Sequence, residues 1–245
     1  MALRDELLRS AKSPEILVQP GDVRDRKRVH EAVRDAEGKW SGLDYVILNA
    51  GIGDSLFPDK FDALLVERIT AVNYLGAIYA IEAALPGMLE RKSGAIVGIS
   101  SIGAVRGFPT SAPYCASKAA LTTFLESLRI DLWGSGVKVI TVSPGFVKTP
   151  LTDRNLFYMP FLQPVDRSAR RIVDGMARGK REIHFPRRLT IPMKLLRCLP
   201  GPVFDLLFTR VVGKKFEKKS SLPPADTLPS SEGPFPLSER PKPDR

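Results

Sequence analysis

Cysteine and histidine are scarce in this chain of 245 residues, which contains two of each. Cys115 and Cys198 are too few for a framework of disulfide bonds. No group of histidine, cysteine and carboxylate side chains has the spacing of metal ligands, because His30 and His184 lie far apart. The sequence therefore predicts neither a disulfide scaffold nor a metal site.

Long apolar runs are also lacking. No stretch has the roughly 20 predominantly apolar residues that a membrane-spanning helix needs. The chain begins with charges at Arg4, Asp5 and Glu6, where a signal peptide would lead into an apolar segment. These absences predict a protein of the cytoplasm.

Acidic residues are outnumbered, and the excess of positive charge is local. The chain has 37 Lys and Arg against 27 Asp and Glu, a formal net charge of +10. Residues 178–219 hold 12 basic and 3 acidic residues, whereas residues 1–177 are close to balance at 22 and 20. This distribution argues against nucleic acid as a partner and indicates one local contact with an anionic group.

Short apolar segments alternate with amphipathic ones along most of the chain. The segments with strand character are 15–20, 43–48, 94–99, 137–142 and, at an edge, 182–186. The segments with helical periodicity are 2–12, 24–40, 64–91, 119–133 and 163–179. This alternation predicts an α/β fold with a doubly wound parallel sheet, in which ligands bind at the carboxyl ends of the strands.

The composition changes after residue 187. Residues 188–216 are basic and apolar and contain several prolines, which predicts a helical extension. Residues 217–245 are rich in Pro, Ser and charge, which predicts a disordered tail. The expected organisation is a core of residues 1–187, an extension of residues 188–216 and a tail of residues 217–245.

Three side chains suggest proton-transfer chemistry. Ser101 follows the strand-like segment 94–99, and Tyr114 and Lys118 are four residues apart on one face of a predicted helix. A lysine ammonium beside a phenol favours the phenolate and so lowers the pKa of the tyrosine. A hydroxyl at the strand end would orient a carbonyl oxygen for the tuned tyrosine. A surface Tyr–Lys pair would have the same spacing, so the rest of the chain decides between these interpretations.

The order of several motifs resembles the short-chain dehydrogenase/reductase family. The resemblance covers about residues 16–149. The matching residues are Asp22, the run Asn49-Ala50-Gly51, Asn73, the set Ser101, Tyr114 and Lys118, and Pro144, Gly145 and Thr149. The resemblance implies a Rossmann-like fold.

The resemblance also implies catalytic roles. Tyr114 would act as general acid and base on a carbonyl or secondary alcohol, and Ser101 would hold the substrate oxygen. Lys118 would lower the pKa of Tyr114 and bind the nicotinamide ribose. Asn73 would connect Lys118 to solvent through a water held on its backbone carbonyl.

The implied cofactor is NAD(P), with NADP preferred over NAD, and it would supply the hydride. The residues expected to contact or support it are Asp22, Asn49, Ala50, Gly51, Tyr114, Lys118, Pro144, Gly145 and Thr149. The implied partner is a small carbonyl or alcohol, and a homo-oligomer is expected because two-fold dimers are common.

The sequence departs from the family at its start. The family begins with a strand, a glycine-rich turn that binds pyrophosphate through backbone N–H groups, a helix and a second strand. This chain begins after that unit, so the fold is expected to be incomplete at the amino end, with apolar edges and an uncovered face. The alternative function is therefore a truncated or non-catalytic relative that binds a protein or a membrane.

The segment 188–216 leaves two interpretations open. It is either a lid or packing helix on the substrate side, or an element at a membrane surface whose apolar residues enter the lipid while its cations meet anionic headgroups. The second interpretation would make a lipid-like ketone a plausible substrate and add a peripheral membrane association to the predicted location.

Overall fold

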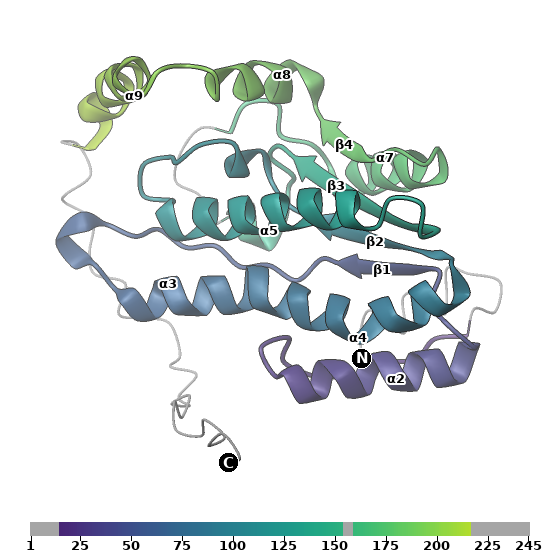
Figure 1. Cartoon of the computed structure of the whole chain (residues 1–245). Helices are drawn as coiled ribbons and strands as arrows, with labels where there is room; N and C mark the ends of the chain where they lie inside the picture. Colours follow the sequence, from purple (N-terminus) through teal and green to yellow (C-terminus); the bar gives the residue numbers. More distant parts are fainter. Residues whose placement is uncertain (1–14, 154–158, 217–245) are drawn as a thin grey trace, which may run out of the picture. The chain divides into compact units, whose positions relative to one another are not determined.

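The computed structural model describes residues 15–153 and 159–216 (Figure 1). The helix predicted at residues 2–12 and the tail at residues 217–245 lie outside the described residues. The chain divides into two compact units, Met1–Pro200 and Gly201–Arg245. The expected domain limits at residues 187 and 216 stay predictions, and each unit is described by itself.

The first unit is built on a parallel sheet of four strands in the order β1-β2-β3-β4. The strands are β1 (Tyr45–Leu48), β2 (Gly94–Ile99), β3 (Val137–Pro144) and β4 (Glu182–Phe185). Ile96 lies beside Val46 on one side and Val139 on the other, which fixes the register of the first three strands. The alternation read from the sequence therefore predicted the parallel sheet correctly.

Helices connect the strands. They are α2 (Arg26–Trp40), α3 (Ala63–Thr70), α4 (Gly76–Arg91), α5 (Ala112–Asp131), α6 (Pro150–Asp153), α7 (Val165–Ala177) and α8 (Arg187–Leu196). A π-turn at Ala71–Leu75 joins α3 to α4, and 3₁₀ turns occupy Pro58–Lys60 and Ile102–Ala104. Helix α5 begins seven residues before the predicted Ala119, because Pro113 is tolerated in a first helical turn.

Helices cover one face of the sheet along β1 to β3 and the other face beside β3 and β4. Alternate residues of a strand point to opposite faces, so Ile96 and Val97 belong to different layers of the core. Ile96 packs with Ile81 of α4 and Leu125 of α5, in the first layer. The second layer combines Val97 with residues of β3 and β4 and with α7. This arrangement confirms the doubly wound Rossmann-like fold.

The expected strand at residues 15–20 is absent. The segment lies outside the sheet, because a strand is defined by hydrogen bonds to a neighbour and no described strand lies beyond β1. Strand β1 is consequently an edge strand, and its Tyr45 and Ile47 are 47% and 52% exposed. The expected buried strand at 43–48 is thus only partly buried. Val46 and Leu48 face the first core layer, so Tyr45 and Ile47 lie on the opposite face. The predicted apolar edge and the predicted uncovered face are therefore both present at β1.

The helical stretch Ala63–Arg91 corrects one expectation from the sequence. By length and composition alone it could cross a membrane, although no segment was expected to do so. Its α4 portion packs Ile81 and Met88 into the core against the sheet. A core helix of a folded domain passes the same test of length and composition, so this finding assigns no membrane span.

The turn before β3 yields a test of the fold. Gly136 has φ of +86°, and a Cβ there would lie 2.0 Å from the carbonyl oxygen of Lys92. Gly134 has a similar φ of +81° and open space around it. We expect Gly134→Ala to cost about 1 kcal/mol for the left-handed backbone alone, and Gly136→Ala to cost roughly 3 kcal/mol or more.

Urea unfolding followed by circular dichroism measures both values. The two variants share the backbone penalty and differ in the clash with Lys92, so their difference reports how closely β3 approaches the end of α4. Equal unfolding free energies for the two variants would contradict this close approach.

Candidate active site

Two neighbouring elements position the predicted catalytic side chains. Ser101 follows β2 with an extended backbone, and its Oγ accepts a hydrogen bond of 3.0 Å from the N–H of Gly103. This bond fixes the hydroxyl at the start of the turn Ile102–Ala104. Tyr114 and Lys118 lie in the first two turns of α5, on the face that packs against this turn and the sheet.

Tyr114 lies between two glycines. A Cβ on Gly53 would approach Tyr114 Cδ2 to 3.2 Å, and a Cβ on Gly103 would approach Tyr114 Cε1 to 3.5 Å and Ser101 Oγ to 3.4 Å. Glycine at both positions therefore leaves room for the ring. The same distances bring Ser101 and Tyr114 together around Gly103, so one small oxygen could reach both hydroxyl groups.

Burial controls the acidity of Tyr114. It raises the pKa of the phenol above its usual value, hydrogen bonding with Ser101 opposes the rise, and the charge of Cys115 adds to it. The prediction from the sequence, that Lys118 lowers the pKa of Tyr114, is therefore wrong for this structure. The physical reason is that desolvation of the phenolate outweighs the nearby favourable contacts.

Lys118 is a buried base, with an exposed fraction of 4%. Its Nζ donates a hydrogen bond of 2.7 Å to the carbonyl oxygen of Ile99, at the end of β2. Burial lowers the pKa of Lys118 to about 8, because the charged ammonium is separated from water. An ammonium carries three donors, so Nζ retains the capacity to bind hydroxyl groups of a ligand.

Asn73 connects α4 to the loop that follows β1. It is almost completely buried in the π-turn, a feature that is frequent at functional sites. Its Oδ1 accepts from the N–H of Ile52 at 2.8 Å, and its Nδ2 donates to the Ile52 carbonyl at 2.9 Å and to Ser117 Oγ at 3.0 Å. These contacts hold the loop beside α5. The relay role expected of its backbone carbonyl stays a prediction.

Ser117 is a site residue that the sequence analysis missed. Its buried Oγ donates to the carbonyl oxygen of Tyr114 at 2.8 Å and accepts from Asn73 Nδ2. Ser100 also contacts α5 through its side chain. Its Oγ donates to the Lys118 carbonyl at 3.2 Å and lies 2.6 Å from Thr122 Oγ1. Both serines hold α5 in place. The available signal was a small polar residue one helical turn after Tyr114 and next to Lys118.

The Asn49-Ala50-Gly51 run lies at the carboxyl end of β1, as expected, and all three residues are exposed. A Cβ on Gly51 would lie 3.3 Å from Lys118 Nζ and 3.6 Å from Asn73 Oδ1. Gly51 therefore borders the buried polar cluster. Glycine at this position leaves room for the buried lysine and asparagine beside the strand end.

Pro144 and Gly145 end β3. The N–H of Gly145 donates to the Phe185 carbonyl at 2.7 Å, and a Cβ on Gly145 would lie 2.7 Å from Leu189 Cδ2. These contacts bring the start of α8 against the end of β3. Helix α8 also contacts the turn that follows Ser101, so it borders the same region.

The contacts that the structure gives for Asp22 and Thr149 are local. The carboxylate of Asp22 pairs with Arg24 at 2.6 Å, and hydrogen bonds from Arg24 lower the pKa of this carboxyl. The N–H of Thr149 donates to Thr152 Oγ1 at 2.9 Å at the start of α6. Their expected roles beside adenine and phosphate stay predictions. Among the described residues no group of His, Cys, Asp and Glu could hold a metal ion.

Comparison with known proteins identifies the family that this chain resembles. Residues 2–156 match the family described as short chain dehydrogenase. An uncharacterized oxidoreductase of Myxococcus xanthus is 40% identical over 86% of this chain and 82% of its own length. A second, of Staphylococcus aureus strain MW2, is 36% identical over 56% of this chain and 59% of its own length.

A solved structure supports the same assignment at the level of the fold. It is a short chain dehydrogenase from Burkholderia cenocepacia in complex with NADP, 23% identical, with a TM-score of 0.70 over 81% of each chain. The fold is therefore shared with a solved member, and the sequence match extends over most of the chain. On this evidence the chain belongs to the short-chain dehydrogenase/reductase family of oxidoreductases.

Proposed function

We propose that the protein transfers a hydride between a nicotinamide cofactor and a carbonyl or secondary alcohol, with Tyr114 as general acid and base. The observation that carries this proposal is the approach of Ser101 and Tyr114 around Gly103, beside the buried Lys118. A carbonyl oxygen there would accept hydrogen bonds from both hydroxyl groups. Polarisation by two donors and a proton from Tyr114 are what reduction requires of the protein.

The raised pKa of Tyr114 favours one direction of the reaction. A phenol that is harder to ionise stays protonated to higher pH, so the free protein holds the proton donor needed for reduction. Oxidation needs the phenolate, which burial disfavours. We therefore propose that carbonyl reduction is the preferred direction near neutral pH.

The residues present fit the nicotinamide end of the cofactor. Lys118 offers donors for ribose hydroxyls beside the accessible backbone of Gly51, and Gly145 ends the neighbouring part of the sheet. The phosphate end would need a glycine-rich turn, and the sequence contains none. When bound, the cofactor supplies the hydride. NADP is the proposed form, supported by the fold shared with the Burkholderia cenocepacia protein in complex with NADP.

The proposed substrate, oligomeric state and location follow the expectations from the sequence. We propose a small carbonyl or alcohol substrate of lipid-like character, a homo-oligomeric state, and a cytoplasmic location with peripheral membrane contact through residues 188–216. The alternative, a relative that only binds proteins or membranes, is the weaker hypothesis. Burial lowers the pKa of Lys118 to about 8, and strongly shifted pKa values are more typical of functional sites than of helices with a structural role alone.

Replacing the phenol tests the central role. Tyr114→Phe should lower the turnover of a ketone panel with NADPH by roughly 10²–10⁴-fold, because the proton donor is lost while the ring still fills the space beside Gly53 and Gly103. Tyr45→Phe, on the exposed edge strand, is the matched control and should keep full activity. Undiminished turnover by Tyr114→Phe would refute the assignment.

Cofactor binding has its own test. Titration of NADPH and NADH, followed by nicotinamide fluorescence, should give saturable binding with the lower Kd for NADPH. Lys118→Ala should weaken binding about tenfold, because hydrogen bonds from a charged donor to ribose are lost. Lys27→Ala, an exposed lysine on α2, is the control. Absence of binding by both cofactors would favour the non-catalytic alternative.

The buried lysine also predicts a dependence of stability on pH. The pKa of Lys118 is about 8 in the folded protein and 10.5 as its ordinary value, so between these limits the unfolded chain binds more protons. Wild-type stability should therefore rise with pH across this window. Relative to Lys118→Met, the gain between pH 7.5 and 10.5 should be on the order of 3 kcal/mol.

Urea unfolding at a series of pH values measures this gain. Lys27→Met, the same change at an exposed position, is the control and should show no comparable slope. A constant difference between wild type and Lys118→Met would mean that Lys118 is not buried in solution.

A further inference from the structure

Helix α8 has two faces of different character. Leu189, Thr190 and Met193 are partly or fully buried, with Thr190 completely inaccessible. On the opposite side, Ile191 and Leu195 are 48% and 65% exposed. Large aliphatic side chains that are exposed together on one face of a helix are typical of a surface that contacts another molecule.

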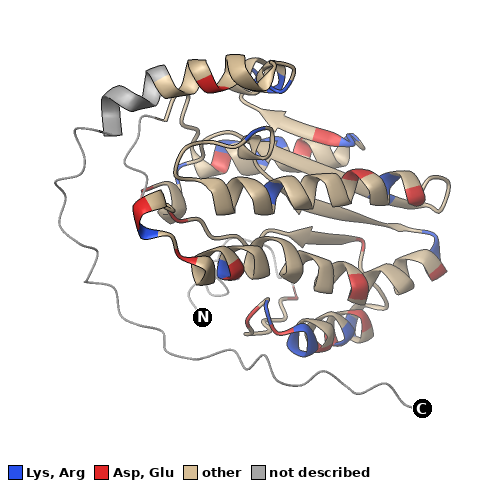
Figure 2. Ribbon diagram, turned by 60° about the vertical axis from the view of Figure 1, so that its left-hand side comes forward, with Lys and Arg blue, Asp and Glu red and all other residues tan. Residues whose placement is uncertain are grey.

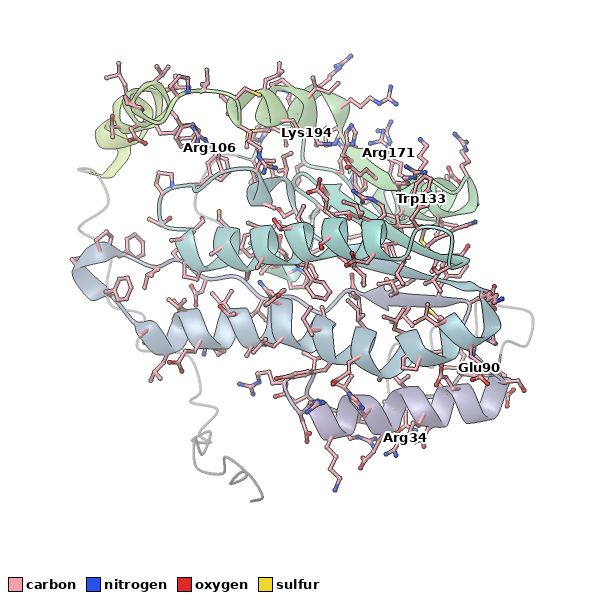
Figure 3. The ribbon with its side chains drawn as sticks, viewed as in Figure 1. Arg34, Glu90, Arg106, Trp133, Arg171 and Lys194 are labelled. Carbon is pink, nitrogen blue, oxygen red and sulfur yellow. The ribbon has the colours of Figure 1, made fainter. Side chains whose placement is uncertain are left out.

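The inner face of α8 borders the candidate active site. Leu189 packs against Gly145 at the end of β3, and the helix contacts the turn that follows Ser101. Arg106, from the same loop as Ser101, donates a hydrogen bond of 2.7 Å to the Leu199 carbonyl just beyond α8 (Figure 3). The segment is therefore held over the site at both ends.

The outer face of α8 is rich in cations. Arg188 lies three and seven residues before Ile191 and Leu195, which places all three on one stripe. The other exposed cations of the segment are Arg187, Arg197 and Lys194, and the Nζ of Lys194 pairs with Glu182 at 2.9 Å. Residues 183–204 contain no Asp or Glu. Figure 2 shows the Lys and Arg positions in blue. Exposed apolar side chains flanked by cations are the pattern of a helix that lies on an anionic membrane.

Helix α9 (Gly201–Phe216), in the second unit, has an exposed apolar face of its own, with the exposed Asp205 in the same turn. Val203, Leu206 and Leu207 are about half exposed and lie three and four residues apart, on one face. Its Phe204 and Phe208 rings stack on each other with their centroids 4.4 Å apart. Two successive helices thus each carry an exposed apolar face.

We propose that the outer face of α8 docks on a lipid bilayer that contains anionic lipids. The cations meet the headgroups, and Ile191 and Leu195 enter the boundary with the acyl chains. Nucleic acid would satisfy the cations and leave both aliphatic side chains in water, so lipid fits the surface better. Four cations on and beside α8 exclude a spanning orientation.

Docking also predicts how the substrate reaches the active site, and this prediction rests on the proposed function. Because the inner face of α8 borders Gly145 and the Ser101 loop, a docked α8 lies between the bilayer and the reacting groups. A carbonyl compound that partitions into the membrane would then reach the site along this helix. The substrate class indicated by this arrangement is an apolar ketone or aldehyde.

Vesicle co-sedimentation of the full chain tests the docking. We expect binding to vesicles of phosphatidylcholine with 30% phosphatidylglycerol, and much weaker binding to phosphatidylcholine alone. Replacing Arg188 and Arg197 by Gln should weaken binding about fivefold for each cation. The double variant Ile191→Gln/Leu195→Gln should lose roughly tenfold or more at both low and high salt.

Matched changes elsewhere serve as controls. Ile130→Gln on α5 removes an aliphatic side chain that is 69% exposed, and Arg34→Gln removes an exposed cation from α2, far from α8 in Figure 3. Neither should change vesicle binding. Failure of wild type to sediment, equal losses in the controls, or displacement from vesicles by DNA would each overturn the proposal.

The substrate consequence has a separate readout. KM for a long-chain ketone in vesicles should rise in Ile191→Gln/Leu195→Gln, while KM and kcat for a short water-miscible ketone stay unchanged. Equal effects on both ketones would overturn the consequence. If the wild-type protein turned over neither ketone, the proposed function would be contradicted. Vesicle co-sedimentation tests the docking separately, because it requires no enzymatic activity.

Discussion

The hydrogen bond from Lys118 Nζ to the Ile99 carbonyl joins α5 to the end of β2, and the candidate site is arranged around it. Placing an ammonium where only 4% of the residue is exposed is unfavourable unless polar groups surround it. The Ile99 carbonyl supplies one such group, and Lys118 Nζ and Asn73 Oδ1 both lie beside Gly51. Asn73 in turn holds Ile52 and Ser117, so strand end, loop and helix meet around the buried lysine.

Burial acts on the two titratable groups of the site in a related way. It raises the pKa of Tyr114 and lowers that of Lys118, so both groups are shifted toward their neutral forms. Hydrogen-bond acceptors or negative charge from a ligand would favour the ammonium again, and the ammonium would then favour the phenolate. The acid–base state of the pair is therefore coupled to what binds beside Lys118, a property of sites that act only when filled.

Local spacing explains what the sequence could predict. Patterns among residues close in sequence predicted β2, β3 and most of α5, and they also singled out Ser101, Tyr114 and Lys118. The strand expected at residues 15–20 failed because pairing depends on a neighbour that pattern alone does not supply. Ser117 was missed because its role arises from a contact 44 residues away. The pKa of Tyr114 was misjudged because burial is a tertiary property.

The position of α8 links the site to the surface of the protein. Leu189 and Ile191 are two residues apart, which on a helix sends one side chain toward Gly145 and the other toward solvent. The two faces belong to one helix of ten residues, so a displacement of the helix moves both of them. Whatever contacts the outer stripe therefore also bears on the wall beside Ser101 and Gly145. The proposed docking surface and the wall beside the candidate site therefore belong to the same element.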